Sequence, residues 1–404
     1  MKDRAARALG RKIAFYRSQR GLSQRDFGAM IDRSETWISQ VERGVRGIDR
    51  MTVLRRVADA LDVPLTELAS ETPVIAAISK RPESAVALRM LLSSSLALAL
   101  AVRPAARSID LDEEDARARK AWMLAHSAAY GELLPLLTDL IPGLERACRT
   151  TTGKTRQRAC AILTRTYHAT AAALSKLGET DAAWVAADRA ISAAERSGDR
   201  LLMAEGAFRL TLVFQADRRY EQAEHTATTA IDALQPLAAA GESAAIALQG
   251  ALLLQLAIAA ARQNRVEQAH TALAGARRAA DTLGADRNDY NTEFGPTNVA
   301  VHEIAVAVEL GNAGTALRLA AGTNTESLSP ERRARVLIDI ARAHMQRRNG
   351  EGAIHSLLDA ARITPEQVRG HRLVQSMIHD LCRAGLGRDP RLRDLAERCG
   401  IHLR

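Results

Sequence analysis

The residues with catalytic or metal-binding potential form short local patterns, and each pattern lacks an essential part of its motif. Thr151-Thr152-Gly153-Lys154-Thr155 ends like a phosphate-binding loop, but that motif needs a glycine five residues before Gly153, where Cys148 stands. The ten histidines include no HExxH pair, and the four cysteines lack the spacing of a metal site. We therefore expect no enzymatic activity, no metal and no cofactor.

Two other segments are dense in polar side chains. The acidic run Asp110–Asp115 could bind a cation, but it is better explained as a complement to the dipole at the start of a helix. Residues 286–298 combine polar and aromatic side chains between two expected helices. This loop could line a ligand pocket, with Asn288, Tyr290 and Asn298 as polar contacts and Phe294 as a wall. Alternatively, it is an ordered connection in which Thr297 or Asn298 caps the next helix.

A third polar set lies near the N-terminus, on one face of an expected helix. Ile38 and Val41, three residues apart, must face inward, so four polar residues face outward: Glu35, Thr36, Ser39 and Gln40. Ser34 is placed to cap this helix, which stops at Gly44.

Four more helices are expected around this one. The first carries Leu9, Ile13 and Tyr16 on one face and ends near Gly21. The others are a short helix that Ser23 caps and that buries Phe27 and Met30, a helix over residues 51–61, and one that starts near Pro64. Two short helices joined by a three-residue turn, the second with small polar residues outside, form a helix-turn-helix.

The spacing of these landmarks is specific. LSQRDFGAMIDRSETWISQVERG, followed by VADALDVPLTEL, resembles the reader of the Xre/Cro family of bacterial and phage repressors over about residues 5–69. The resemblance implies that the chain binds double-stranded DNA, with Gln24 donating to a phosphate and the outer face of residues 35–40 in the major groove. The DNA-binding residues it implies are Gln24, Arg33, Ser34, Glu35, Thr36, Ser39, Gln40, Arg43 and Arg46.

Two residues of this region have other expected roles. Glu42 is expected to form an internal ion pair or cap and not a base contact. Trp37 stands where smaller polar residues are common in the family, so it either packs under the loop or stacks on a sugar.

The charge balance agrees with a polyanionic partner but does not prove one. The net charge is +9, yet only six of the 56 basic residues are lysines, and an excess of arginine also follows from a GC-rich genome. Residues 1–70 hold fourteen Lys and Arg against nine Asp and Glu, so more than half of the surplus lies in the predicted reader.

The remaining residues predict an all-α repeat array. Aromatic residues are only 3% of the chain, and glycine and proline are scarce, which disfavours sheet folds. Five turn-to-helix junctions place a buried-type alanine at similar steps, at Ala182, Ala223, Ala269, Ala316 and Ala353. These units resemble tetratricopeptide (TPR) repeats with a longer period. We expect a reader at residues 1–70, a linker at 71–83 and a TPR-like array at 84–404.

The layout as a whole is similar to a group of actinobacterial regulators and to Gram-positive quorum-sensing regulators that bind peptides. It implies a cytoplasmic homodimer that reads a palindromic operator and senses a peptide or small molecule. We expect no membrane contact, because the apolar stretch at residues 90–102 is too short to span a bilayer. The alternatives are a TPR-type adaptor with a vestigial reader, and a repressor controlled by a protein partner.

Overall fold

The computed structural model describes residues 2–46, 48, 51–63, 67–68, 83–92, 109–127 and 129–401, and their regular structure is helical. Within this part of the chain the one extended pairing is an isolated bridge between Arg287 and Phe294. The predicted all-α class is therefore confirmed. The predicted linker, apart from its last residue, and most of the apolar stretch at 90–102 lie outside the described residues.

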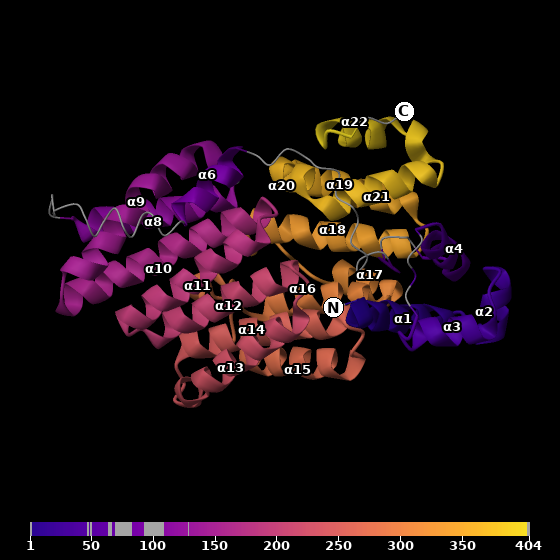
Figure 1. Ribbon diagram of the computed structural model, residues 1–404, viewed down its shortest axis with the longest axis horizontal. Coiled ribbons are helices and arrows are strands. Elements are labelled where there is room, and N and C mark those ends of the chain that lie inside the picture. Colours follow the sequence, from indigo (N-terminus) through magenta and orange to yellow (C-terminus); the bar gives the residue numbers. More distant parts are fainter. Residues whose placement is uncertain are drawn as a thin grey trace. The chain divides into compact units, whose positions relative to one another are not determined.

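The N-terminal helices pack around one apolar core. They are α1 (Lys2–Gln19), α2 (Gln24–Met30), α3 (Glu35–Glu42) and α4 (Met51–Leu61), drawn in indigo in Figure 1. All three residues of the predicted face of α1 are buried, as are Ile38 and Val41 of α3. The prediction for Met30 was wrong: its side chain is 52% exposed, because the next residue, Ile31, occupies the inward position at the end of α2.

The rest of the described chain is a succession of helices, most of them paired as hairpins (Figure 1). The first of these helices is the short α6 (Glu83–Leu91). Two pairs follow it: α8 (Leu111–His126) with α9 (Tyr130–Thr150), and α10 (Gly153–Lys176) with α11 (Thr180–Ser197). The series continues as α12 (Arg200–Ala216), α13 (Tyr220–Ala239), α14 (Ser243–Arg262), α15 (Val266–Leu283), α16 (Pro296–Glu309), α17 (Ala313–Ala321), α18 (Pro330–Gln346) and α19 (Gly350–Ile363). The last elements are α20 (Pro365–Gly370), α21 (Arg372–Arg383) and α22 (Pro390–Arg398). Stacked antiparallel hairpins of this kind make a TPR-like α-solenoid.

The five predicted repeat junctions are the hairpin turns before α11, α13, α15, α17 and α19. Each turn has a left-handed residue one position before the N-cap, namely Gly178, Arg218, Asn264, Gly311 and Arg348. In each, the N-cap N–H also bonds to the carbonyl five residues earlier, as Asn312 does to Ala307 at 2.8 Å. The five signature alanines are 8% exposed or less, because the partner helix lies against each of them. The repeat prediction is confirmed at all five positions.

The acidic run behaves as a helix start. Asp110 is the N-cap of α8, and its side chain accepts hydrogen bonds from the backbone N–H groups of Asp112 and Glu113. Carboxylates in the first turn then complement the dipole of the helix. Among the described residues no group of three or more His, Cys, Asp or Glu side chains is arranged to hold a metal ion.

The chain divides into two compact units. The first comprises Met1–Ser79, Ala260–Gln268 and Ala300–Arg404, and the second comprises Lys80–Ala259 and Ala269–Val299. The N-terminal helices therefore share a unit with α17 to α22. Of the described helices, α14 alone is long and apolar enough to cross a membrane, with a mean hydropathy of 1.9, and 78% of that stretch is buried inside the protein. Such burial is typical of a core helix.

Candidate nucleic-acid interface

The turn between α2 and α3 is built by two serine caps and a left-handed residue. Ser23 accepts a hydrogen bond from the N–H of Asp26 at 3.1 Å and donates to its carboxylate at 2.6 Å. Ser34 accepts from the N–H of Trp37 at 3.2 Å. Asp32 occupies the left-handed region at φ 56°, which reverses the chain between the two helices. Both predicted caps are confirmed.

The outer face of α3 is open to solvent where the sequence predicts base contacts. Glu35 and Thr36 are exposed, and Ser39 and Gln40 are half-buried. The inward residues Ile38 and Val41 are 1% and 2% exposed. The polar residues therefore share the accessible side of a helix that is anchored from behind.

The buried side chain of Glu42, on α3, connects this helix to α1 and α2. Its carboxylate accepts from Arg17 Nε at 2.6 Å and Nη2 at 3.1 Å, and from Gln24 Nε2 at 2.6 Å. The hydrogen bonding between Arg17 and Glu42 raises the pKa of the Arg17 guanidinium. The predicted internal ion pair of Glu42 is confirmed. An amide nitrogen carries two hydrogens, so Gln24 can donate one to Glu42 and still offer the other to a phosphate.

Trp37 is half-buried against the core of the N-terminal helices, which agrees with the packing alternative. The guanidinium of Arg33 lies over its ring, 5.7 Å from the centroid. Arg43 and Arg46 are exposed, and in the part of the chain that the structure describes they form no ion pair with a carboxylate. We call the nine predicted contact residues the DNA face: Gln24, Arg33, Ser34, Glu35, Thr36, Ser39, Gln40, Arg43 and Arg46. Their contacts to DNA remain a prediction.

Residues 8–70 match the family model of a helix-turn-helix domain. The chain carries a helix-turn-helix domain. No curated protein matches the chain. Among solved structures, the chain is similar to the crystal structure of Bacillus thuringiensis PlcR in complex with the peptide PapR7 and DNA, at 16% identity and a TM-score of 0.29. That alignment covers 69% of this chain and 96% of the PlcR chain.

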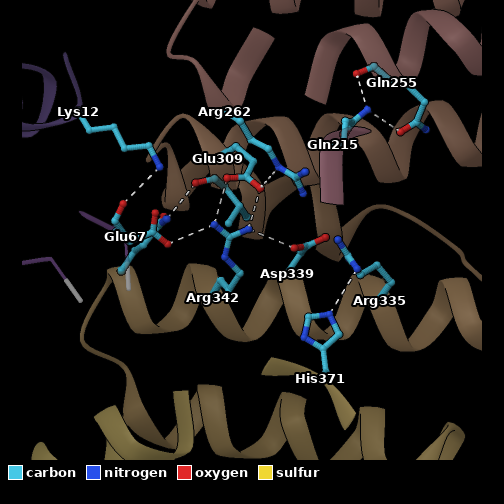
Figure 2. A network of polar contacts seen from close by, with 12 residues as sticks. Lys12, Glu67, Gln215, Gln255, Arg262, Glu309, Arg335, Asp339, Arg342 and His371 are labelled. Carbon is cyan, nitrogen blue, oxygen red and sulfur yellow. Dashed lines mark hydrogen bonds and ion pairs between the residues drawn. The ribbon is translucent and has the colours of Figure 1, made fainter. Parts of the chain in front are cut away.

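On another side, the helix-turn-helix domain meets α16 and α18 of the first unit through charged side chains (Figure 2). The guanidinium of Arg342 lies between Glu67 and Glu309. Its Nη2 is 3.3 Å from Glu67 Oε1 and 3.2 Å from Glu309 Oε2, and its Nη1 is 3.2 Å from Glu309 Oε1. Arg262 Nε also donates to Glu309 at 3.1 Å. We call this contact the seam.

The seam is buried, and its charges depend on one another. The side chains of Glu67, Glu309 and Arg342 are 5%, 10% and 11% exposed. Burial alone would raise the pKa of Glu309, but the charges of Arg342 and Arg262 hold that pKa well below its ordinary value. Burial would likewise lower the pKa of Arg342, and the two carboxylates hold it well above the usual range. Glu309 and Arg342 are therefore both charged at neutral pH.

Smaller contacts surround the ion network. Lys12 Nζ donates to the backbone carbonyl of Glu67 at 3.2 Å, and the Tyr16 hydroxyl donates to the Glu67 carboxylate at 3.4 Å. Gly311, at φ 77°, lies under the Tyr16 ring, where a Cβ would come within 2.8 Å of a ring carbon. Arg348 forms an ion pair with Asp62. The first unit thus holds its DNA-binding domain by polar contacts and a close backbone approach.

The predicted ligand loop belongs to the second unit and is tightly ordered by its own chain. Phe294 is fully buried on Gly250 of α14, where a Cβ would lie 2.0 Å from the ring. Asn298 is also buried, whereas Asn288 is exposed and accepts from the N–H of Glu293 at 3.1 Å. The predicted cap was wrong: Asp286 accepts from the N–H of Thr297 at 3.0 Å, because the loop folds back to place that carboxylate at the start of α16.

The backbone at the tip of this loop is strained, and an arginine of another helix donates hydrogen bonds to it. Tyr290, Asn291 and Glu293 occupy the left-handed region at φ 51°, 54° and 49°, where residues other than glycine are uncommon. Arg209 of α12 donates from Nη2 to the carbonyls of Tyr290 at 3.2 Å and Asn291 at 3.0 Å. Its guanidinium also lies over the Trp122 ring, 4.5 Å from the centroid.

Sequence reasoning missed both of these anchoring arginines. Arg342 stands in an arginine-rich helix and Arg209 in a leucine-rich one, and neither has a local sequence context that distinguishes it from a solvated arginine. Their partners are distant in sequence, since Glu67 and Arg342 are 275 residues apart. No local pattern could have identified them.

Proposed function

We propose that the protein is a cytoplasmic transcriptional regulator of the Xre type, which reads a palindromic operator as a homodimer. The observation that carries the proposal is the α2–α3 unit, with two serine caps, a buried inner face and an accessible polar outer face. A domain of this size covers one half-site, and a symmetric pair reads two half-sites about one helical turn apart. The proposal requires no catalytic step.

The roles on the DNA face follow from side-chain chemistry. Gln40 can make two hydrogen bonds to adenine, Glu35 can accept from the amino group of cytosine, and Thr36 can meet the methyl group of thymine. The exposed guanidiniums of Arg43 and Arg46 suit phosphates. A bulky Trp37 on the groove side of α3 would favour an adaptor with a vestigial reader, but Trp37 lies against the core.

Signal sensing is assigned to the helical array, through the loop at residues 286–298. Three left-handed residues at its tip support this assignment, since backbone strain of this kind gathers at ligand sites and switches. A peptide or small molecule that engages Asn288 and Tyr290 would compete with the hold of Arg209 on the loop carbonyls. In the dimer, a change in the array would alter the spacing of the two readers and so the affinity for the operator.

Selection from a random library of double-stranded DNA with the full-length protein tests the reader. We expect enrichment of a palindrome whose half-sites lie about one turn apart. The Ser39→Ala/Gln40→Ala variant should lose the enrichment, whereas Arg55→Gln/Arg56→Gln, which changes exposed residues of α4, should keep it. A folded wild-type protein that enriches no sequence would favour the adaptor, and sedimentation as a monomer would exclude the proposed dimer.

A thermal-shift screen of the full chain against fractions of a culture extract tests the sensor. A ligand stabilises the state that it binds, so an active fraction should raise the melting temperature. The matched variant is Asn288→Ala/Tyr290→Ala, which should lose that increase. An equal increase in the variant would place the ligand elsewhere.

A further inference from the structure

A polar cleft of about 420 Å³ lies in the first unit, between the helix-turn-helix domain and the start of α17. Its size is within the range of pockets that hold small ligands. The helix-turn-helix domain contributes Arg20 and Asp62, and the array contributes Gly314, Arg318, Gln346 and Arg347. The cleft is distinct from the loop at residues 286–298, which belongs to the second unit.

Two guanidiniums of the cleft converge on one glycine. A Cβ placed on Gly314 would lie 3.1 Å from Arg347 Nη1 and 3.9 Å from Arg318 Nη1. Two positive groups that approach the same point repel each other unless an anion lies between them. Gly314 is in the first turn of α17, where backbone N–H groups also favour negative charge.

No carboxylate among the described residues pairs with these arginines. Arg20 donates to the carbonyl of Ala60 at 2.7 Å and Arg318 to the hydroxyl of Thr315 at 3.0 Å. Neither they nor Arg347 form an ion pair with any residue that the structure describes. The cleft has one acidic lining residue, Asp62, and it pairs with Arg348. The lining therefore keeps a surplus of positive charge.

Gln346 lines the cleft and carries a buried hydrogen-bond acceptor. Its Nε2 donates to the carbonyl of Val308 at 2.9 Å, which fixes the amide. Its Oε1 is buried and has no hydrogen-bond partner among the described residues. A buried acceptor in this condition is stabilised when a donor arrives.

We propose that this cleft binds a small metabolite that carries a phosphate or carboxylate group and, beside it, a hydroxyl or amine donor. The anionic group would lie between Arg318 and Arg347, with Arg20 contributing from the helix-turn-helix domain, and the donor would reach Gln346 Oε1. Because the lining comes from both sides, a bound metabolite ties the helix-turn-helix domain to the array. The site goes beyond the proposed function, and binding to it is measured without DNA.

Calorimetry on the full-length protein tests the site with inorganic pyrophosphate and with citrate, each against sodium chloride at matched ionic strength. We expect one of the two anions to bind with a stoichiometry of one, which also distinguishes the phosphate class from the carboxylate class. Arg318→Gln/Arg347→Gln should weaken binding at least about tenfold, because two charge-assisted contacts are lost. Arg55→Gln/Arg56→Gln removes the same charge from an exposed helix and should leave the affinity unchanged.

Gly314→Ala provides a second variant that should fold well, since alanine favours a helix more than glycine does. Its methyl group occupies the point where the guanidiniums converge, so binding should weaken as well. The proposal is overturned if neither anion binds better than chloride, or if the Arg318/Arg347 and Arg55/Arg56 variants bind alike. It is also overturned if the cleft variants lose affinity for DNA alone, which would assign these arginines to the DNA backbone.

Discussion

The DNA face and the seam are two sides of one small domain, and they use the same kinds of side chain in opposite ways. On the DNA face, Arg43 and Glu35 are exposed, so their charges are open to solvent. At the seam, Glu67 and Arg342 are almost fully buried, and other protein groups satisfy theirs. A charge that water can solvate is available to a ligand, whereas a charge buried in a network belongs to the fold.

This difference predicts where substitutions will act. An exposed ion pair contributes little to stability, because water competes for both partners. In a buried network the loss of one partner leaves another charge without compensation. We therefore expect substitutions at the seam to change the stability of the first unit and substitutions on the DNA face to change affinity for DNA.

The largest expected effect is at the seam. Arg342→Met removes the guanidinium that separates the carboxylates of Glu67 and Glu309, and the loss of such a partner typically lowers the free energy of unfolding by about 3–5 kcal/mol. Urea denaturation followed by circular dichroism measures it. Arg348→Met is the matched control, because Arg348 pairs with Asp62 but its side chain is 70% exposed, so the loss should stay below about 1 kcal/mol.

A second substitution tests the reason for that effect. Glu67→Gln in the Arg342→Met background neutralises a buried carboxylate that has lost its guanidinium, so part of the lost stability should return. Equal losses for Arg342→Met and Arg348→Met, with no rescue, would show that the seam is no stronger than a surface contact.

The comparison also explains which parts of the molecule could be predicted from sequence. The helix-turn-helix domain depends on neighbours in the sequence: Ser34 caps α3 by accepting from the N–H three residues on, and Ile38 and Val41 lie one turn apart. Such relations repeat in every domain of this type and are visible in a linear pattern. The seam depends on the meeting of α18 with the end of the N-terminal domain, which no local pattern encodes.

The repeat turns are an intermediate case. The signature alanines could be predicted, because a small residue is required wherever two helices approach closely. The left-handed residue before each N-cap could not, since three of the five are Arg218, Asn264 and Arg348 and not glycine. The turn hydrogen bonds hold these residues in the left-handed region, and a rule based on glycine alone overlooks them.

On the DNA face the expected effects are on binding. Gln40→Ala should cost about 1–3 kcal/mol at one base pair of the selected operator and little at the others, because it removes a direct base contact. Arg43→Ala should weaken binding to all sequences and reduce the salt dependence by about one released counterion. Titrations against the operator and its single-base variants, at several salt concentrations, separate the two. An equal loss on operator and scrambled DNA for Gln40→Ala would remove Gln40 from base recognition.

The positive charge near the seam also lowers the pKa of a histidine, His371. The Nδ1 atom of His371 is buried and has no hydrogen-bond partner among the described residues. Burial, together with the charges of Arg335 and Arg342, lowers the pKa of His371 to about 3. The ring is therefore neutral in the folded protein, while the unfolded chain takes up a proton near its ordinary pKa of about 6.5.

The sign of the pH dependence follows. The unfolded state binds more protons than the folded state below about pH 6.5, so stability falls as the pH falls from there toward 3. Between about pH 7.5 and about pH 5.5 the loss should approach 1.4 kcal/mol, the value of one pKa unit. His371→Gln should remove that part of the slope. His379→Gln, which changes an exposed histidine of α21, is the control. An unchanged slope in His371→Gln would show that this ring already binds a proton in the folded state.

The smallest expected effect separates the two roles of one residue on the DNA face. Ser34 caps α3 through a single hydrogen bond to the N–H of Trp37, so Ser34→Ala should lower stability by about 1 kcal/mol. Ser34→Asp retains a good cap and should leave stability nearly unchanged, while its negative charge faces the DNA phosphates and should weaken binding. Urea denaturation and DNA titration of both variants measure these outcomes. If Ser34→Asp bound DNA as well as the wild type does, α3 would not lie against DNA at its N-terminus, and the DNA face would need to be placed elsewhere.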